Sequence, residues 1–210
     1  MAVRIETLAL GPLETNCHVV AAGGECWVVD PSLWPGPLLG LLDRLDLRVR
    51  RVLLTHGHGD HIGGVAEVLA AFPDATLTCP AGDMDMLADA EANFSRSLGM
   101  PIRVDAPAEG VSPGETLQLA DTSWQVLDTS GHTPGGVSYY CAAAPAAITG
   151  DALFAGSIGR TDIPGGDTAR LLANIREHLL TLPDETRVLP GHGPETTIGA
   201  ERRGNPFLQG

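Results

Sequence analysis

The 210-residue sequence predicts a mixed α/β sandwich in which β-sheets lie inside and helices cover them. Three observations support this fold class. Short apolar runs of strand length recur from the beginning of the chain to its end. Longer segments between these runs carry apolar residues at helical spacing. No linker, repeat or low-complexity block divides the chain, and its length fits one domain over residues 1–210.

The first half of the chain alternates predicted strands with predicted helices. Glycine and proline at 11–12 end the first strand, and a glycine pair at 23–24 marks the turn of a hairpin. Leucines at helical spacing between Pro37 and Asp46 predict an amphipathic helix. The predicted strands are 3–10, 17–21, 26–29, a central 49–54 and 75–78, and the predicted helices are 37–46, 62–71 and most of 80–98.

The second half predicts two strand pairs, one long helix and a last short strand. The pairs are 115–119 with 124–127 and 137–141 with 146–149, the helix is 169–180, and the final strand is 188–189. Between the two halves, residues 99–114 are rich in turn-forming residues. This segment is either a plain surface connection or a lid over a substrate site.

The composition argues against several classes of partner. The net charge is −13, and all 13 basic residues are arginine. An acidic chain without a basic tract disfavours nucleic acid and anionic membrane surfaces as partners. The four cysteines show no C-x-x-C spacing and are expected to be free, buried thiols. No signal peptide or membrane span is predicted, so a cytoplasmic location is expected.

The strongest functional signal is the stretch 55–61, which reads T-H-x-H-x-D-H directly after the predicted strand 49–54. In extended backbone His56 and His58 point to the same side, and Asp60 and His61 follow where the chain must turn. This arrangement offers one pair of ligands to one metal and another pair to a second. Imidazole with carboxylate suits zinc, iron or manganese. Packing alone explains the cluster poorly, because buried polar groups cost free energy unless they are paired.

Three further candidate ligands each follow a predicted strand and lie next to glycine. They are His132 in S-G-H-T-P-G-G, Asp151 in T-G-D and His192 in P-G-H-G. Each one alone is an ordinary turn pair. Their shared placement beside glycine, which lets the backbone approach a buried ion closely, makes them candidates for the same site.

The motifs H-x-H-x-D-H, G-H-T-P-G, T-G-D and G-H-G, in this order, resemble the metallo-β-lactamase superfamily over nearly the whole chain. Within it, G-D-A-L-F at 150–154, G-R-T-D at 159–162 and the ending E-R-R-G-N-P-F-L at 201–208 are similar to the glyoxalase II-like branch, in its short bacterial form. The resemblance implies an αβ/βα four-layer sandwich, with a metal site at the edge of two facing sheets. It implies no added C-terminal helical domain for the substrate.

The resemblance also implies a ligand set for two divalent metal ions, with zinc preferred and iron or manganese as alternatives. His56, His58 and His132 would hold one ion, Asp60, His61 and His192 the other, and Asp151 would bridge them. A hydroxide that bridges the metals would attack a thioester carbonyl, and Asp60 would guide its proton. Asp30, after an early strand, would support the ligand loop. Its other interpretation is a plain strand-ending Asp-Pro turn.

The implied reaction is hydrolysis of a small-molecule thioester, with hydroxyacylglutathione as the expected substrate. Arg160 lies where the family places a basic residue for the glycyl carboxylate of glutathione, although it is equally explained as a surface arginine paired with Asp162. The chain departs from larger relatives in having no lysine and in having Gly193 and Pro194, rather than tyrosine, after the last histidine.

Two other readings stay open at this point. A mono-iron persulfide dioxygenase shares several of the motifs and would use His56, His132 and Asp151, but its P-A-H-D-Y ending differs from P-G-H-G-P at 190–194. A lactonase or β-lactamase is also compatible, because ester and thioester attack develop the same charge in the transition state.

Overall fold

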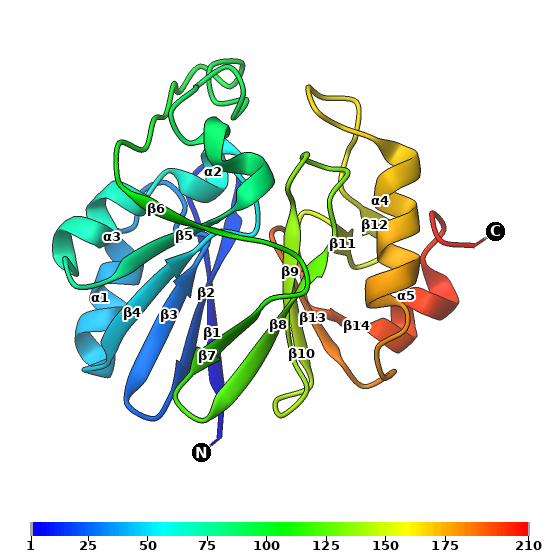
Figure 1. Cartoon of the computed structure of the whole chain (residues 1–210), viewed down its shortest axis with the longest axis horizontal. Helices are drawn as coiled ribbons and strands as arrows, with labels where there is room; N and C mark the ends of the chain where they lie inside the picture. Colours follow the sequence, from blue (N-terminus) through cyan, green and yellow to red (C-terminus); the bar gives the residue numbers. More distant parts are fainter. Residues whose placement is uncertain (1, 210) are drawn as a thin grey trace.

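The computed structural model describes residues 2–209 and places two six-stranded β-sheets face to face (Figure 1). Helices α1 (Gly36–Leu45) and α3 (Val65–Ala71) lie on the outer side of one sheet. Helices α4 (Thr168–Asn174) and α5 (Ile198–Gly204) lie on the outer side of the other. The order helix, sheet, sheet, helix is the four-layer αβ/βα sandwich that the motif resemblance implies.

The first sheet is built from the first half of the chain. Its strands follow in sequence order: β1 (Arg4–Leu10), β2 (Thr15–Ala22), β3 (Glu25–Val29), β4 (Arg48–Leu53), β5 (Thr76–Pro80) and β6 (Ala108–Val111). The first three strands are antiparallel, and β3 to β6 run parallel to one another. Parallel neighbours require a crossover connection. Helix α1 lies in the crossover from β3 to β4, and α2 (Gly59–Ile62) and α3 lie in the one from β4 to β5.

The second sheet comes from the second half of the chain and has the order β14–β13–β10–β9–β8–β7. Its only parallel pair is β10 with β13, which are connected through α4 and the π-helical η2 (Ile175–Leu179). A separate two-stranded hairpin follows β10. The strands are β7 (Thr116–Leu119), β8 (Thr122–Asp128), β9 (Val137–Cys141), β10 (Ala146–Gly150), β13 (Arg187–Pro190) and β14 (Thr196–Thr197), with β11 (Leu153–Phe154) and β12 (Ser157–Ile158) in the hairpin.

Three apolar clusters fill the spaces between the four layers. One packs the first sheet against its helices through residues such as Leu38 and Val52. The central cluster joins the two sheets, and the rings of Trp27 and Trp124 lie 6.0 Å apart within it. The third packs the second sheet against α4, η2 and α5. Burial of this apolar surface is the main force that holds the two sheets in one orientation, and it fixes the edge where their loops meet.

Most of the predicted strands and the helices 37–46 and 169–180 are confirmed, with ends shifted by a few residues. The prediction of helix over most of 80–98 is wrong. Only the 3-10 helix η1 (Ala81–Met86) forms there, and the rest is turns. Side chains explain the difference, because Asn93 and Ser95 bond to backbone groups of their own segment in place of a helical ladder.

Other departures are smaller. The predicted helix 62–71 is divided at Gly63 and Gly64 into α2 and α3. Part of the turn-rich segment 99–114 forms β6, the edge strand of the first sheet. Strands β11, β12 and β14 and helix α5 have no counterpart in the sequence prediction. All four cysteines are free and buried, as expected. No helix within residues 2–209 is both long and apolar enough to cross a bilayer.

Candidate metal centre

The seven predicted ligands meet at one edge of the sandwich, where loops from both sheets converge. His56 and His58 follow β4, while Asp60 and His61 lie in the short helix α2 directly after them. The other three follow strands of the second sheet: His132 comes after β8, Asp151 after β10 and His192 after β13. Ligands that lie far apart in the sequence are therefore brought together by strand ends. Open α/β sheets bind ligands at such ends.

The first ligand cluster contains three buried histidines: His56, His58 and His132. One nitrogen from each lies within 4.8 Å of the others. The closest approach is 2.9 Å, between His58 Nδ1 and His132 Nε2. Three converging imidazole nitrogens are a common ligand set for one divalent ion with an open position.

The second ligand cluster contains Asp60, His61 and His192, again with one ligand atom from each within 4.8 Å. Asp60 Oδ2 lies 3.5 Å from His61 Nε2 and 3.2 Å from His192 Nε2. His192 is the most open of these, with 28% of its side chain exposed, while His61 is wholly buried. The more accessible edge of the centre therefore lies at His192.

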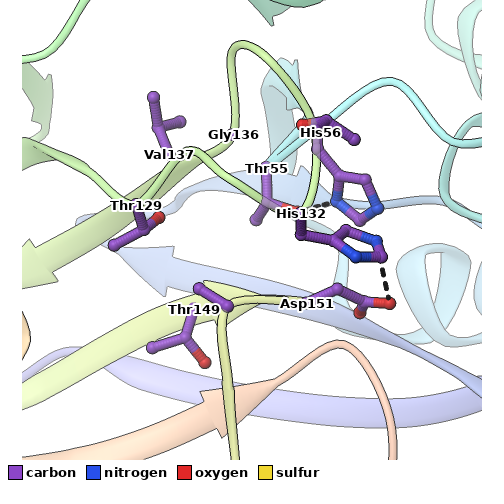
Figure 2. Close-up of a pocket in the computed structure, with 10 residues that line it drawn as sticks. Thr55, His56, Thr129, His132, Gly136, Val137, Thr149 and Asp151 are labelled. Carbon is purple, nitrogen blue, oxygen red and sulfur yellow. Dashed lines mark hydrogen bonds and ion pairs between the residues drawn. The ribbon is translucent and has the colours of Figure 1, made fainter. Parts of the chain in front are cut away.

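Asp151 lies between the two clusters. Its Oδ1 is 3.3 Å from His61 Nε2, and its Oδ2 is 3.5 Å from His132 Nε2 and 3.6 Å from His192 Nε2. Oδ2 thus lies between the two clusters, and Oδ1 lies beside the second. Figure 2 shows Asp151 facing His132 beside a small cavity that Thr55 and His56 also line. That cavity measures about 10 Å³, close to the space of one water molecule.

Three buried atoms of these ligands have no hydrogen-bond partner: His56 Nε2, His61 Nε2 and Asp151 Oδ1. Unpaired buried polar atoms are rare in proteins because each one costs free energy. Here they converge with the other ligand atoms of both clusters. Nitrogen and carboxylate oxygen in this combination suit zinc, iron or manganese. The residues present therefore fit two divalent ions.

The far sides of four ligand rings, those of His56, His61, His132 and His192, are held by hydrogen-bond partners. His56 Nδ1 lies 3.0 Å from Thr55 Oγ1, and Thr55 Oγ1 donates to Asp30 Oδ2 at 2.6 Å. The same carboxylate oxygen lies 3.0 Å from His61 Nδ1. The other partners are backbone carbonyls: Arg160 O at 2.7 Å from His132 Nδ1 and Leu13 O at 3.1 Å from His192 Nδ1. Such partners fix the tautomer and direction of a metal-binding imidazole.

Burial and neighbouring charge set the protonation of the ligands. Burial, followed by the charge of His132, lowers the pKa of His58 to about 3, and burial with the neighbouring histidines also lowers the pKa of His56. Burial disfavours a charged Asp60, but His61 and hydrogen bonds from His192 and Thr15 hold its pKa below the usual range. Against burial, the nearby carboxylates raise the pKa of His61. His56 and His58 thus stay neutral imidazoles, the form that binds metal.

Glycine permits the close packing of these loops, as the sequence suggested. A Cβ on Gly191 would lie 2.6 Å from His61 Cε1 and would overlap Asp151 Oδ1. A Cβ on Gly150 would overlap the side chain of Thr55. Both glycines flank strand ends that carry a ligand. Their lack of a side chain allows the two halves of the centre to approach each other.

Asp83 is an important contact that the sequence did not reveal. It is wholly buried and accepts hydrogen bonds from Gly57 N at 3.0 Å, Thr133 Oγ1 at 2.6 Å and Gly135 N at 2.7 Å. It therefore ties the loop of His56 and His58 to the loop of His132. The sequence did not distinguish Asp83 from Asp85, because both occur in one stretch that was predicted to be helical.

Arg160 takes a position that the sequence left open. Its guanidinium makes two hydrogen bonds to Asp162, at 2.8 and 2.9 Å, and both side chains are exposed. Only its carbonyl oxygen contacts the ligand set, through His132. The pairing with Asp162 is the alternative that the sequence suggested, and a role in substrate binding stays a prediction.

Comparison with protein families and curated proteins identifies related chains. The model of the Metallo-beta-lactamase superfamily matches residues 10–192. Probable metallo-hydrolase YqgX of Bacillus subtilis is 40% identical over 205 residues, which cover 97% of this chain and 96% of the relative. Hydroxyacylglutathione hydrolase GloC of Haemophilus influenzae is 34% identical over 210 residues, which cover 98% of both chains.

Solved structures agree with this comparison. The crystal structure of BLEG-1 B3 metallo-beta-lactamase has a TM-score of 0.94 at 40% identity and covers 99% of this chain and 100% of its own. TTHA1623 in a di-iron-bound form has a TM-score of 0.87 at 38% identity, with 97% and 100% covered. ETHE1 from Myxococcus xanthus has a TM-score of 0.76 at 29% identity, with 98% and 84% covered.

Proposed function

Because the chain belongs to the metallo-beta-lactamase superfamily and shares its fold, we propose that it is a dinuclear metal-dependent hydrolase of small-molecule thioesters. Hydroxyacylglutathione is the proposed substrate, and zinc is the proposed metal. The placement of Asp151 carries the proposal. Its Oδ2 lies near His132 of the first cluster and His192 of the second, and its Oδ1 lies near His61 of the second. A carboxylate shared by the two clusters supports two ions rather than one.

Two divalent ions, when bound, would supply an activated water and stabilise the negative charge that develops on the carbonyl oxygen. The chain's own residues orient that chemistry. Asp60 Oδ2 is held by Thr15 Oγ1 at 2.9 Å and lies beside His192, so it is placed to hold the proton of the attacking water. The leaving thiol has a pKa of about 8.5 and departs without a strong general acid.

The choice of glutathione as carrier rests on two observations. The relative from Haemophilus influenzae is named a hydroxyacylglutathione hydrolase. Arg160 also lies close to the metal centre, because its backbone carbonyl bonds to the candidate ligand His132. Its guanidinium would have to leave Asp162 to bind a glutathione carboxylate.

The direct test is hydrolysis of S-lactoylglutathione by purified protein, followed as release of free thiol, with metal content measured on the same sample. Turnover at a kcat/KM of about 10⁴ M⁻¹s⁻¹ or more, by protein that holds two ions per chain, is expected. His58→Ala should lose metal and activity together, whereas exposed Asp43→Asn should keep both. A two-metal protein that leaves this thioester intact would contradict the proposal.

Two solved structures favour specific alternatives. Similarity to ETHE1 supports a mono-iron persulfide dioxygenase, which would show oxygen uptake with glutathione persulfide and one iron per chain. Similarity to BLEG-1 supports hydrolysis of a β-lactam, which a chromogenic cephalosporin would report. In the mono-iron alternative the second cluster of Asp60, His61 and His192 would bind no metal. For that reason we prefer the hydrolase.

A further inference from the structure

Phe94 has an unusual backbone conformation beside the metal centre. Its φ is +64°, in the left-handed region that bulky residues rarely adopt. Its ring is only partly buried, and the ring centroid lies 6.4 Å from that of His58. Strained residues of this kind persist only where the surrounding structure enforces them, and they concentrate at functional sites.

The surroundings of Phe94 enforce this conformation through both of its neighbours. Asn93 O accepts from Gly59 N of the ligand helix α2 at 2.8 Å, and the Asn93 side chain donates to Met86 O and Ile102 O, both at 3.0 Å. Ser95 Oγ donates to Asn93 Oδ1 at 2.6 Å and accepts from Ile102 N at 2.8 Å. Asn93 and Ser95 are wholly buried.

The segment is in close contact with α2. A Cβ on Gly59 would lie 2.5 Å from Ser95 Cβ, so the segment packs directly against the helix that carries Asp60 and His61. Phe94 therefore lies beside the first cluster, on a segment that its neighbours Asn93 and Ser95 hold in place. A rigid aromatic ring at this position has the properties of a binding surface for an apolar group.

The opposite ligand cluster also has apolar neighbours. The ring of Phe154 lies 6.4 Å from that of His192, and Leu13, which holds His192 through its carbonyl, is 41% exposed. The arginines that follow these positions in the chain are already paired. Arg96 lies 3.3 Å from Glu91, and Arg160 binds Asp162. Apolar side chains thus lie beside outer ligands of both clusters, where they can contact an apolar part of a substrate.

We propose that Phe94 is a specificity-determining residue whose ring binds the acyl side of the substrate, so that the enzyme prefers thioesters with an aryl-bearing acyl group. This inference rests on the proposed thioester hydrolysis for its reaction. The contact of the ring with the ligand is a separate property, which can be measured without turnover. Phe94 would act by stacking or edge contact with the acyl group and would take no part in bond cleavage.

The test compares two thioethers of N-acetylcysteamine, one S-phenylethyl and one S-ethyl, as non-hydrolysable ligands of the metal-loaded protein. Calorimetric titration should give at least about tenfold tighter binding of the phenylethyl compound. Phe94→Gly should abolish that preference and still fold, because glycine adopts a φ of +64° without strain. Phe94→Tyr, which keeps the ring, and Leu98→Ala, an exposed position in the same segment, should retain it.

Turnover separates this inference from the proposed function. With phenylacetyl and acetyl thioesters of N-acetylcysteamine, the wild-type protein should favour the phenylacetyl compound in kcat/KM by about tenfold, and Phe94→Gly should remove the difference through KM. Equal affinity for the two thioethers, no affinity for either, or an unchanged preference in Phe94→Gly overturns the role of Phe94. A thioether preference that depends on Phe94, without hydrolysis of any thioester, supports the binding role and rejects the thioesterase.

Discussion

Asp30 holds His61 from the side opposite the metal centre. The Asp30 Oδ2 to His61 Nδ1 distance is 3.0 Å, and His61 Nε2 on the other edge of the ring faces Asp60 and Asp151. Asp30 is wholly buried and also accepts from the amide and hydroxyl of Thr55. One carboxylate therefore orients a ligand of the second cluster and the loop that begins the first.

Asp30→Asn should weaken metal binding because an amide cannot accept from all three of these donors. Loss of such an outer partner lowers metal affinity by roughly 10–100-fold. Competition with a chelator of known affinity measures the change. Asp43→Asn, on the exposed side of α1, is the matched control. Wild-type affinity in Asp30→Asn would show that Asp30 is only a strand-ending turn residue.

Gly191→Ala should reduce metal content without a large loss of fold. The added methyl group would overlap Asp151 Oδ1 and come within 2.6 Å of His61 Cε1, so the two ligands must separate. Metal per chain, measured after gel filtration, should fall below the wild-type value. Gly204→Ala offers a control, since a Cβ there has open space around it. Full metal content in Gly191→Ala would show that the loops can shift to accommodate the methyl group and still place both ligands.

Asp83→Ala should destabilise the protein by about 2–4 kcal/mol. Three donors that now bond to the carboxylate would be left without it: Gly57 N, Thr133 Oγ1 and Gly135 N. Denaturant unfolding measures the free energy directly. Asp85→Ala removes an exposed carboxylate from the same 3-10 helix and should have little effect. Equal stability of the two variants would show that the hydrogen bonds of Asp83 do not stabilise the contact between the two loops.

His18 should make the folded state sensitive to mild acid. It is buried between Thr7 Oγ1, at 2.9 Å from Nδ1, and Pro190 O, at 3.3 Å from Nε2. Burial lowers its pKa to about 4, although Asp30 acts in the opposite direction. The unfolded chain binds the proton near pH 6.5 and the folded chain only near pH 4. The free energy of unfolding therefore falls as the pH drops across that interval, by about 3 kcal/mol for this group.

His18→Gln should flatten the dependence of unfolding free energy on pH between 6.5 and 4. Both proteins are compared at the same metal content, because other buried histidines contribute to the slope in each. His178→Gln removes an imidazole from the outer helical segment and serves as the control. The same slope in His18→Gln and wild type would reject the assignment.

The sequence predicted which side chains gather at this edge because its signals are local. His56, His58, Asp60 and His61 occur within one short stretch, and the later ligands each stand beside glycine after a strand. The structure brings all seven together. Helices and strands with clear periodicity, such as α1 and β4, were likewise predictable.

The remaining features depend on contacts between distant segments, which periodicity does not encode. Asp83 gains its role from Thr133 and Gly135, residues of another sheet's loop. The stretch around Phe94 looks helical in composition, but Asn93 and Ser95 bond to the backbone around them and prevent a helix. The short strands β11, β12 and β14 have two residues each, too few to show alternation.

The alternation of ligands between the two sheets has a consequence for biosynthesis. The first cluster is incomplete without His132 and the second without His192, so a nascent polypeptide that ends before His132 holds neither of the two in full. The first cluster gains its last ligand with His132 and the second only with His192. During synthesis the residues of the first cluster are thus complete before those of the second. Ions held by these clusters would link an early part of the chain to a late part.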